Sequence, residues 1–219
     1  MKRFMFSSFV LVIANLLAGQ RAQAQPTLEG SNLGQTPTGS ASIGSDSWIA
    51  QSFATGPGSS SYSLNSVQLL MDAATGAPSG FNVSIYAKSG AAHSFSPDTE
   101  IPLGNLGSLT GSDPSAGGVF TYTASDIVLL PTTWYFVVVS SSTPVAQGAY
   151  IWSAADSFTG GPFIIDDTYY SSTDGSTWSV HNREDVFQLA IYTTPTPEPA
   201  TLALVGLGLA CVGLRRRRA

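Results

Sequence analysis

The sequence predicts an all-β fold: an antiparallel β-sandwich with jelly-roll-like connectivity, preceded by a signal peptide and followed by a single transmembrane helix. Three observations favour the sandwich. Short runs alternate apolar with polar residues, clusters of Gly, Pro, Ser and Asp separate these runs, and no segment between the two chain ends has the periodicity of an amphipathic helix. The spacing of the runs does not fit propeller blades, and a closed barrel is the alternative.

The first 24 residues are typical of a secretory signal peptide. Lys2 and Arg3 precede an apolar run at residues 4–18, and the small-x-small sequence at 22–24 matches a signal-peptidase site. A buried core helix is the alternative for the apolar run. We predict export and cleavage at that site, followed by a lead-in segment at residues 25–44 that contains few bulky side chains.

Residues 45–192 form the predicted sandwich domain. Residues 134–139 are apolar on both faces, which predicts a central strand, and Asp174-Gly175 lies between two β-rich runs, which predicts a hairpin. In chain order the strand candidates are residues 50–55, 62–71, 81–85, 119–123, 127–130, 134–139, 169–170, 178–180 and 186–192.

The exported part of the chain is acidic. Residues 25–199 hold Lys88 and Arg183 against all fourteen Asp and Glu residues, a formal net charge of −12. A surface of this sign repels nucleic acid and anionic lipid, so we predict no nucleic-acid partner. The only cysteine, Cys211, lies outside this part, so packing rather than a disulfide must stabilise it.

The C-terminal end has the layout of a membrane anchor. A stalk of Pro and Thr at residues 193–199 contains Pro197-Glu198-Pro199, an apolar transmembrane segment follows at 200–214, and the tail at 215–219 is basic. Its four arginines predict that this tail is cytoplasmic. Fifteen residues at about 1.5 Å each make a helix of about 22 Å, shorter than the roughly 30 Å hydrocarbon core, so we expect a marginal anchor.

This order of Pro-Glu-Pro, apolar segment and arginine cluster resembles the PEP-CTERM sorting signal. The resemblance covers residues 196–219 and implies processing by an exosortase-type transpeptidase, as in Gram-negative bacteria that produce exopolysaccharide. It also implies transient anchoring in the membrane, followed by a location at the cell surface or outside the cell. The sorting residues that it implies are Pro197, Glu198, Pro199, Arg215, Arg216, Arg217 and Arg218.

The predicted sandwich resembles the choice-of-anchor domains, in particular type R. These are bacterial surface domains that occur with different anchoring tails and have no assigned catalytic residues. The resemblance therefore implies a non-enzymatic surface domain without a cofactor. It rests on the segments Gln51-Ser52-Phe53, Tyr62-x-Leu64-x-Ser66-Val67, Val83-Ser84-Ile85-Tyr86, Thr132 to Val138, Tyr150-x-Trp152 and Phe187-x-Leu189-x-Ile191-Tyr192.

Common catalytic motifs are missing from the sequence. It contains no His-Glu-x-x-His, phosphate-binding loop, dinucleotide fingerprint or Gly-x-Ser-x-Gly, and only His93 and His181 have side chains that ordinarily titrate near neutral pH. Both histidines lie in polar, turn-like stretches. The sequence does not exclude a Ser-His-Asp triad, because a triad is recognised by its geometry in the folded protein. We nevertheless predict that the chain is not an enzyme.

Carboxylates offer a second kind of candidate site. Asp166-Asp167, Asp156 and Glu184-Asp185 are potential glycosidase pairs, but neighbouring residues on a strand point to opposite faces. Asp166 and Asp167, together with Asp174 or backbone carbonyls of a loop, are an alternative candidate for a hard-cation site. Their spacing matches no known calcium loop, so we predict solvated turn carboxylates and no metal.

Three tryptophans stand in polar stretches, where an exposed indole ring is able to stack on a sugar. They are Trp48, Trp152 and Trp178, whereas Trp134 lies in an apolar run and is predicted to belong to the core. Ordinary core packing is the alternative for each of the three.

The sequence as a whole predicts an exported, surface-anchored, non-enzymatic protein. We expect a structural or adhesive role in an extracellular polysaccharide matrix or biofilm, with exopolysaccharide or matrix proteins as partners beside the exosortase. A carbohydrate-binding module that uses the three tryptophans is one alternative, and a secreted hydrolase is another.

Overall fold

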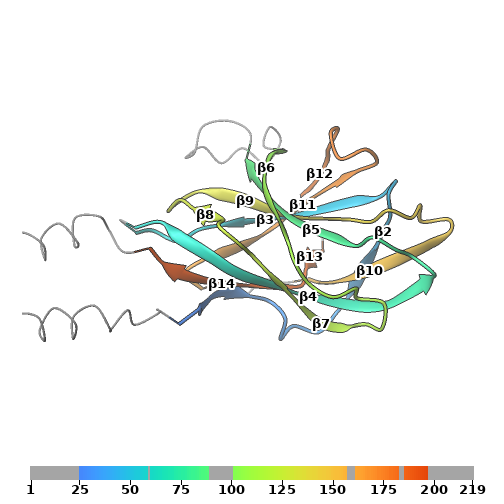
Figure 1. The fold of residues 1–219 in the computed structure, drawn as a ribbon, viewed down its shortest axis with the longest axis horizontal. Coiled ribbons are helices and arrows are strands. Elements are labelled where there is room, and N and C mark those ends of the chain that lie inside the picture. The colour runs from blue at the N-terminus through green and yellow to red at the C-terminus, as the bar shows by residue number, and fades with distance from the viewer. Residues whose placement is uncertain (1–24, 59, 89–100, 157–160, 183–184, 197–219) are drawn as a thin grey trace, which may run out of the picture.

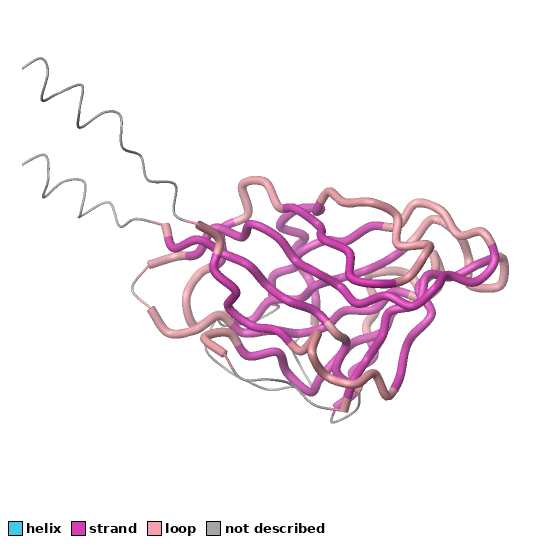
Figure 2. The backbone as a smooth tube through the Cα atoms, turned by 90° about the horizontal axis from the view of Figure 1, so that it is seen from below, coloured by secondary structure: helices cyan, strands magenta, loops and turns pink. Residues whose placement is uncertain are grey.

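The computed structural model describes residues 25–58, 60–88, 101–156, 161–182 and 185–196, which form two facing antiparallel sheets (Figures 1 and 2). Within these ranges the chain contains fourteen strands and no helix. The strands are β1 (Thr27–Ser31), β2 (Gly39–Ile43), β3 (Trp48–Ala54), β4 (Tyr62–Gly76), β5 (Asn82–Lys88), β6 (Pro102–Leu109), β7 (Gly118–Thr123), β8 (Val128–Leu129), β9 (Trp134–Ser140), β10 (Gly148–Ala155), β11 (Ile164–Ser172), β12 (Ser179–Asn182), β13 (Val186–Phe187) and β14 (Leu189–Pro195).

The sandwich is built mainly from strands that are distant in sequence. One sheet has the order β12-β11-β3-β9-β5-β6, and the other is arranged around the long strand β4, which pairs with β14, β10, β7 and β8. Every pairing is antiparallel, and among the described strands only β5–β6 and β11–β12 join consecutive elements. The predicted central strand at 134–139 is confirmed, because β9 lies between β3 and β5.

The core lies between the two sheets. Alternate residues of β4 point into it, as the period-2 pattern of Val67, Leu69 and Met71 predicts, and each of these is at most 2 % exposed. Opposite them β9 contributes Val137 and Val139. Trp134 is only half-buried, because it is the first residue of β9 and lies at the end of the sheet. The prediction that it belongs to the core is therefore wrong.

Two strands fall within residues 25–44, which the sequence analysis left outside the sandwich. β1 pairs with β14, and β2 pairs with β10 along five positions. The lead-in segment is therefore part of the fold. The predicted strand set also lacked β6 and β10.

Buried amides tie the sheets together where regular pairing breaks. β11 carries a bulge between Ile165 and Tyr169, and the amide of Gln51 donates to the Asp166 and Thr168 carbonyls at 2.8 and 3.1 Å. Its oxygen accepts from the backbone N–H of Phe187 on the other sheet at 2.9 Å. This pairing explains how a fully buried glutamine is tolerated in the interior.

The described chain begins and ends at the same end of the sandwich, at the left of Figure 1. Tyr62, the first residue of β4, pairs with Pro195, the last residue of β14. Thr196 then donates to the Ser61 carbonyl from both its N–H and its hydroxyl, at 2.9 and 2.7 Å. We call this the terminal end of the sandwich.

Candidate functional site

Trp152 is a core residue and not a surface for stacking a sugar. Its side chain is 0 % exposed, and its indole N–H donates to the Gln188 carbonyl at 3.0 Å. Its ring packs on Phe187 with centroids 4.8 Å apart. An exposed ring was one of two expectations because Trp152 stands in a polar stretch, but its polar neighbour Ser153 is buried too, and the core-packing alternative holds.

Trp48 and Trp178 share one face of the molecule. Both are half-buried and pack against a small cluster formed by Ala50, Phe136, Val138 and Tyr170. These residues alternate along β3 and β9 with residues of the core, so the cluster lies on the outer face of its sheet. We call it the outer aromatic cluster.

The two indole rings are held differently. The N–H of Trp48 donates to the Ser45 carbonyl at 3.1 Å, and the β11–β12 turn packs on its ring. A Cβ atom added to Gly175 would lie 2.7 Å from that ring. The N–H of Trp178 is buried and has no hydrogen-bond partner in the described structure, which leaves one unsatisfied donor in the cluster.

His181 lies next to a serine. Its Nε2 atom is 2.9 Å from Ser171 Oγ across the β11–β12 pairing, and its ring stacks on Tyr169 with centroids 4.4 Å apart and planes within 5°. A nucleophilic serine also needs donors that stabilise an oxyanion and a cleft that admits a substrate. His93, the other predicted candidate, lies outside the described residues.

Asp166 and Asp167 interact at an irregular point of β11. The β11 bulge breaks the regular alternation there, and the Asp167 N–H donates to Asp166 Oδ1 at 3.0 Å. Burial raises the pKa of Asp166 to about 6, and the neighbouring charge of Asp167 adds to this effect.

The other predicted carboxylates are separate from this pair. Asp174 organises the hairpin turn by accepting from the N–H groups of Ser176 and Thr177, both at 2.8 Å, and these bonds hold its pKa well below the ordinary value. Asp156 accepts from the Thr38 hydroxyl at 2.7 Å. Asp185 lies beside Gly39, and Glu184 is outside the described residues. Within the described ranges no three His, Cys, Asp or Glu residues are grouped so that they would hold a metal ion.

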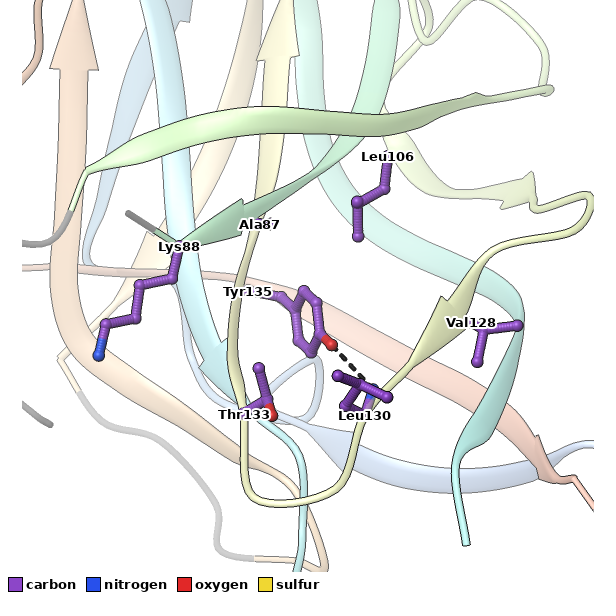
Figure 3. Close-up of a pocket in the computed structure, with 7 residues that line it drawn as sticks. All are labelled: Ala87, Lys88, Leu106, Val128, Leu130, Thr133 and Tyr135. Atoms are coloured by element: carbon purple, nitrogen blue, oxygen red, sulfur yellow. Dashed lines mark hydrogen bonds between the residues drawn. The ribbon is translucent and has the colours of Figure 1, made fainter. Parts of the chain in front are cut away.

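An apolar cavity of about 260 Å³ opens near the terminal end (Figure 3). The hydroxyl of Tyr135 accepts from the Leu130 N–H at 2.8 Å across it, and burial raises the pKa of this tyrosine. The amino group of Lys88 points away from the centre of the cavity. Its lining consists of Ala87, Lys88, Leu106, Val128, Leu130, Thr133 and Tyr135.

Sequence reasoning missed this cavity. Its residues come from four separate stretches of chain, which are brought together by the pairing of β5 with β6 and β9 and by the pairing of β8 with β4. The available signal in the sequence was the apolar run at residues 127–130. In the structure Val128 and Leu130 of this run are exposed, while Ile127 and Leu129 are buried.

The sorting motif is supported by a comparison with protein families. The PEP-CTERM protein-sorting motif matches residues 195–218 and so includes Pro197, Glu198, Pro199 and Arg215 to Arg218, which follow the described part of the chain. A comparison with curated proteins found no match. The motif indicates an exported protein that is processed by an exosortase and displayed at the cell surface after transient anchoring. In the described ranges no helix is long and apolar enough to span a membrane, and residues 1–24 and 200–214 lie outside them.

Proposed function

We propose that this chain is a non-enzymatic surface protein with a structural or adhesive role in an extracellular polysaccharide matrix or biofilm. The observation that carries the proposal is the sorting motif, which begins at Pro195, the last residue of β14. The sandwich is thus the part that export delivers to the surface. The resemblance of residues 45–192 to choice-of-anchor domains and the net charge of −12 over residues 25–199 support the same role.

Intact-mass analysis of the protein from an exosortase-bearing host tests the sorting part of this proposal. We expect the secreted form to lack residues 1–24 and the arginine cluster. A variant with Arg215 to Arg218 replaced by alanine should stay unprocessed. Full-length protein in the cytosol, with both ends intact, would overturn the proposal.

The matrix role needs a separate measurement. A deletion strain should form a matrix that releases more polysaccharide on washing, and the wild-type chain should restore retention. A variant that lacks residues 197–219 should not restore it, because it is exported without being sorted. Equal retention in all strains would contradict the structural role.

Glycan binding through Trp48 and Trp178 is the second candidate function. It is favoured by their common position in the outer aromatic cluster, where both rings are half-buried. Apolar ring faces beside polar groups suit the stacking and hydrogen bonding of a pyranose. Trp152 has no part in this candidate, because it is fully buried.

Affinity electrophoresis in gels that contain the host polysaccharide distinguishes this candidate. Trp48→Ala and Trp178→Ala should each abolish the retardation seen for the wild type. The matched control is Tyr192→Ala, a half-buried aromatic residue on the other sheet, which should be retarded as the wild type is. Loss of retardation in all three variants, or no retardation of the wild type, would contradict a site at the cluster.

A further inference from the structure

Exposed apolar side chains gather at the terminal end of the sandwich. Six large hydrophobic side chains of the described residues are exposed, and only Val119 lies elsewhere, on β7 in the far half of its sheet. We call the other five the apolar tip. They are Leu28 (47 % exposed), Leu106 (43 %), Val128 (51 %), Leu130 (54 %) and Ile164 (47 %).

Strand register places Val128 and Ile164 at this end, and it places Leu28 four residues further in, level with Ser66 of β4. Val128 pairs with Ser63, next to the point where β4 meets the last residue of β14. On the other sheet Ile164 pairs with Ala54, the last residue of β3. The Thr55 hydroxyl then donates to the Leu130 carbonyl at 2.6 Å, which joins the two sheets at this end. Leu106 lies beside Val128 and Leu130 around the cavity (Figure 3).

The tether to the membrane is short. Thr196 is fixed to Ser61 by two hydrogen bonds, and the apolar segment of the sorting motif begins at Ala200. Four Cα–Cα steps of about 3.8 Å separate these residues, so the span is at most about 15 Å. While residues 200–214 are in the bilayer, the terminal end must therefore lie next to the membrane surface.

We propose that the apolar tip docks on the lipid surface while the sorting tail is inserted. This proposal rests on the anchoring step of the proposed function. The tail holds the tip at high local concentration, so a contact too weak to bind alone becomes occupied, and cleavage of the tail releases it. The docked tip holds Thr196, the last described residue, close to the membrane surface.

Charge near the tip selects the kind of lipid. The Glu29 carboxylate is buried and accepts from the Thr193 hydroxyl at 3.2 Å, so its charge does not face the bilayer. Asp126 is exposed two residues before Val128. Lys88 lies beside Leu106, Val128 and Leu130, so the tip has one charge of each sign nearby and suits a zwitterionic surface.

Quenching by lipid tests the contact in the full chain. The protein is reconstituted through its tail into phosphatidylcholine vesicles, in a Cys211→Ser background with one fluorophore at Val128→Cys. Headgroup-labelled nitroxide lipid should quench this site at least threefold more than Val119→Cys, a similarly exposed valine (54 %) that pairs seven residues further along β4. Leu130→Ser together with Ile164→Ser should remove most of the difference.

The outcomes separate docking from anchoring. Flotation of the chain with vesicles reports insertion of the tail, so its failure counts against the proposed function and not only against docking. Flotation with equal quenching at the two sites overturns docking. If the Val128 fluorophore is shielded without vesicles and the chain elutes as a dimer, the tip binds a second copy, which also overturns docking on lipid.

Discussion

Gln51 is a buried side chain that hydrogen-bonds to both sheets of the sandwich. Its amide bonds the carbonyls of the β11 bulge, and its oxygen accepts from Phe187 on the facing sheet. Replacing Gln51 with leucine would keep the volume but remove the bonds to the Asp166 carbonyl and the Phe187 N–H, whereas the Thr168 carbonyl keeps its bond from the Ser52 hydroxyl at 2.7 Å. Each unsatisfied group costs about 1–3 kcal/mol.

We therefore predict that Gln51→Leu lowers the free energy of unfolding by about 3 kcal/mol. Urea denaturation followed by tryptophan fluorescence measures the change. The control is Gln68→Leu, because Gln68 is only part-buried and bonds the Thr121 hydroxyl at an exposed position, so its loss should cost less than about 0.5 kcal/mol. Equal effects of the two substitutions would contradict the role assigned to Gln51.

Asp166 should make the protein less stable as the pH rises. Its pKa is raised to about 6 by burial, whereas an aspartate in the unfolded chain titrates near 4. Between these values the folded state binds one more proton, so the free energy of unfolding falls from pH 4 to pH 6 and is level above that range.

We predict that Asp166→Asn removes this fall and raises the stability at pH 8 by about 1 kcal/mol, a value reduced because water still reaches the pair. Urea denaturation at several pH values provides the measurement. Asp167→Asn should leave a smaller fall, since it removes the like charge but not the burial. An unchanged pH profile in Asp166→Asn would show that another group titrates.

The tryptophans show where residue-scale prediction stops. Trp48, Trp152 and Trp178 have similar neighbours in the sequence, yet Trp152 is fully buried while the other two are half-buried on an outer face. The difference depends on strand pairing, because Trp152 lies where β10 is paired with both β2 and β4. The residues that flank each tryptophan in the sequence do not indicate which strands will pair beside it.

At the scale of the element, the β11–β12 hairpin was predicted correctly from Asp174-Gly175. Both residues act locally: Asp174 bonds the turn, and Gly175 takes a φ of 73°, which favours glycine. Such a turn needs no distant partner, so the sequence determines it.

We predict that Gly175→Ala lowers the free energy of unfolding by about 1–2 kcal/mol, since the new Cβ is strained and collides with the Trp48 ring. The midpoint of urea unfolding measures the loss. Gly34→Ala is the control, because a Cβ there meets no atom within 4 Å, and we expect a change below about 0.5 kcal/mol. If Trp48 is needed for glycan binding, Gly175→Ala should also weaken retention by the polysaccharide.

Strands without bulky side chains escaped prediction for a physical reason. β2 has the sequence GSASI and β6 the sequence PLGNLGSL, so neither presents the alternation that marks a half-buried strand. β2 is held in its sheet by backbone pairing with β10, which is distant in the sequence. β6 is held by pairing with β5, which precedes it by a long connection. By contrast, β9 was predicted as central because its own side chains are apolar on both faces.

At the scale of the whole molecule, the two chain ends and the sandwich form one arrangement. β1 and β14 pair with each other, so export would deliver both ends of the mature chain to one side of the domain. The sorting motif starts at Pro195, where β14 ends. Sequence patterns predicted the anchor, but only the fold shows that the chain enters the sorting motif beside the apolar tip.

The pairing of β1 and β2 leads to a prediction about truncation. Residues 25–44 supply Asn32, whose oxygen accepts from the Leu189 N–H at 2.7 Å, and the fully buried Ile43. Removing this segment would expose the edges of β14 and β10 and leave buried backbone groups unsatisfied. We predict that a chain lacking residues 25–44 shows no cooperative thermal transition by circular dichroism.

The matched control is deletion of residues 197–219, which removes a similar length from the other end. Because β14 and Thr196 remain, the melting temperature should stay within about 2 °C of that of the chain that keeps this tail. A cooperative transition in the chain lacking 25–44, at a melting temperature close to that of the control, would mean that β1 and β2 are additions to a sandwich that is stable without them. In that case the boundary at residue 45 expected from the sequence would describe the folding unit better than the observed strand pairing does.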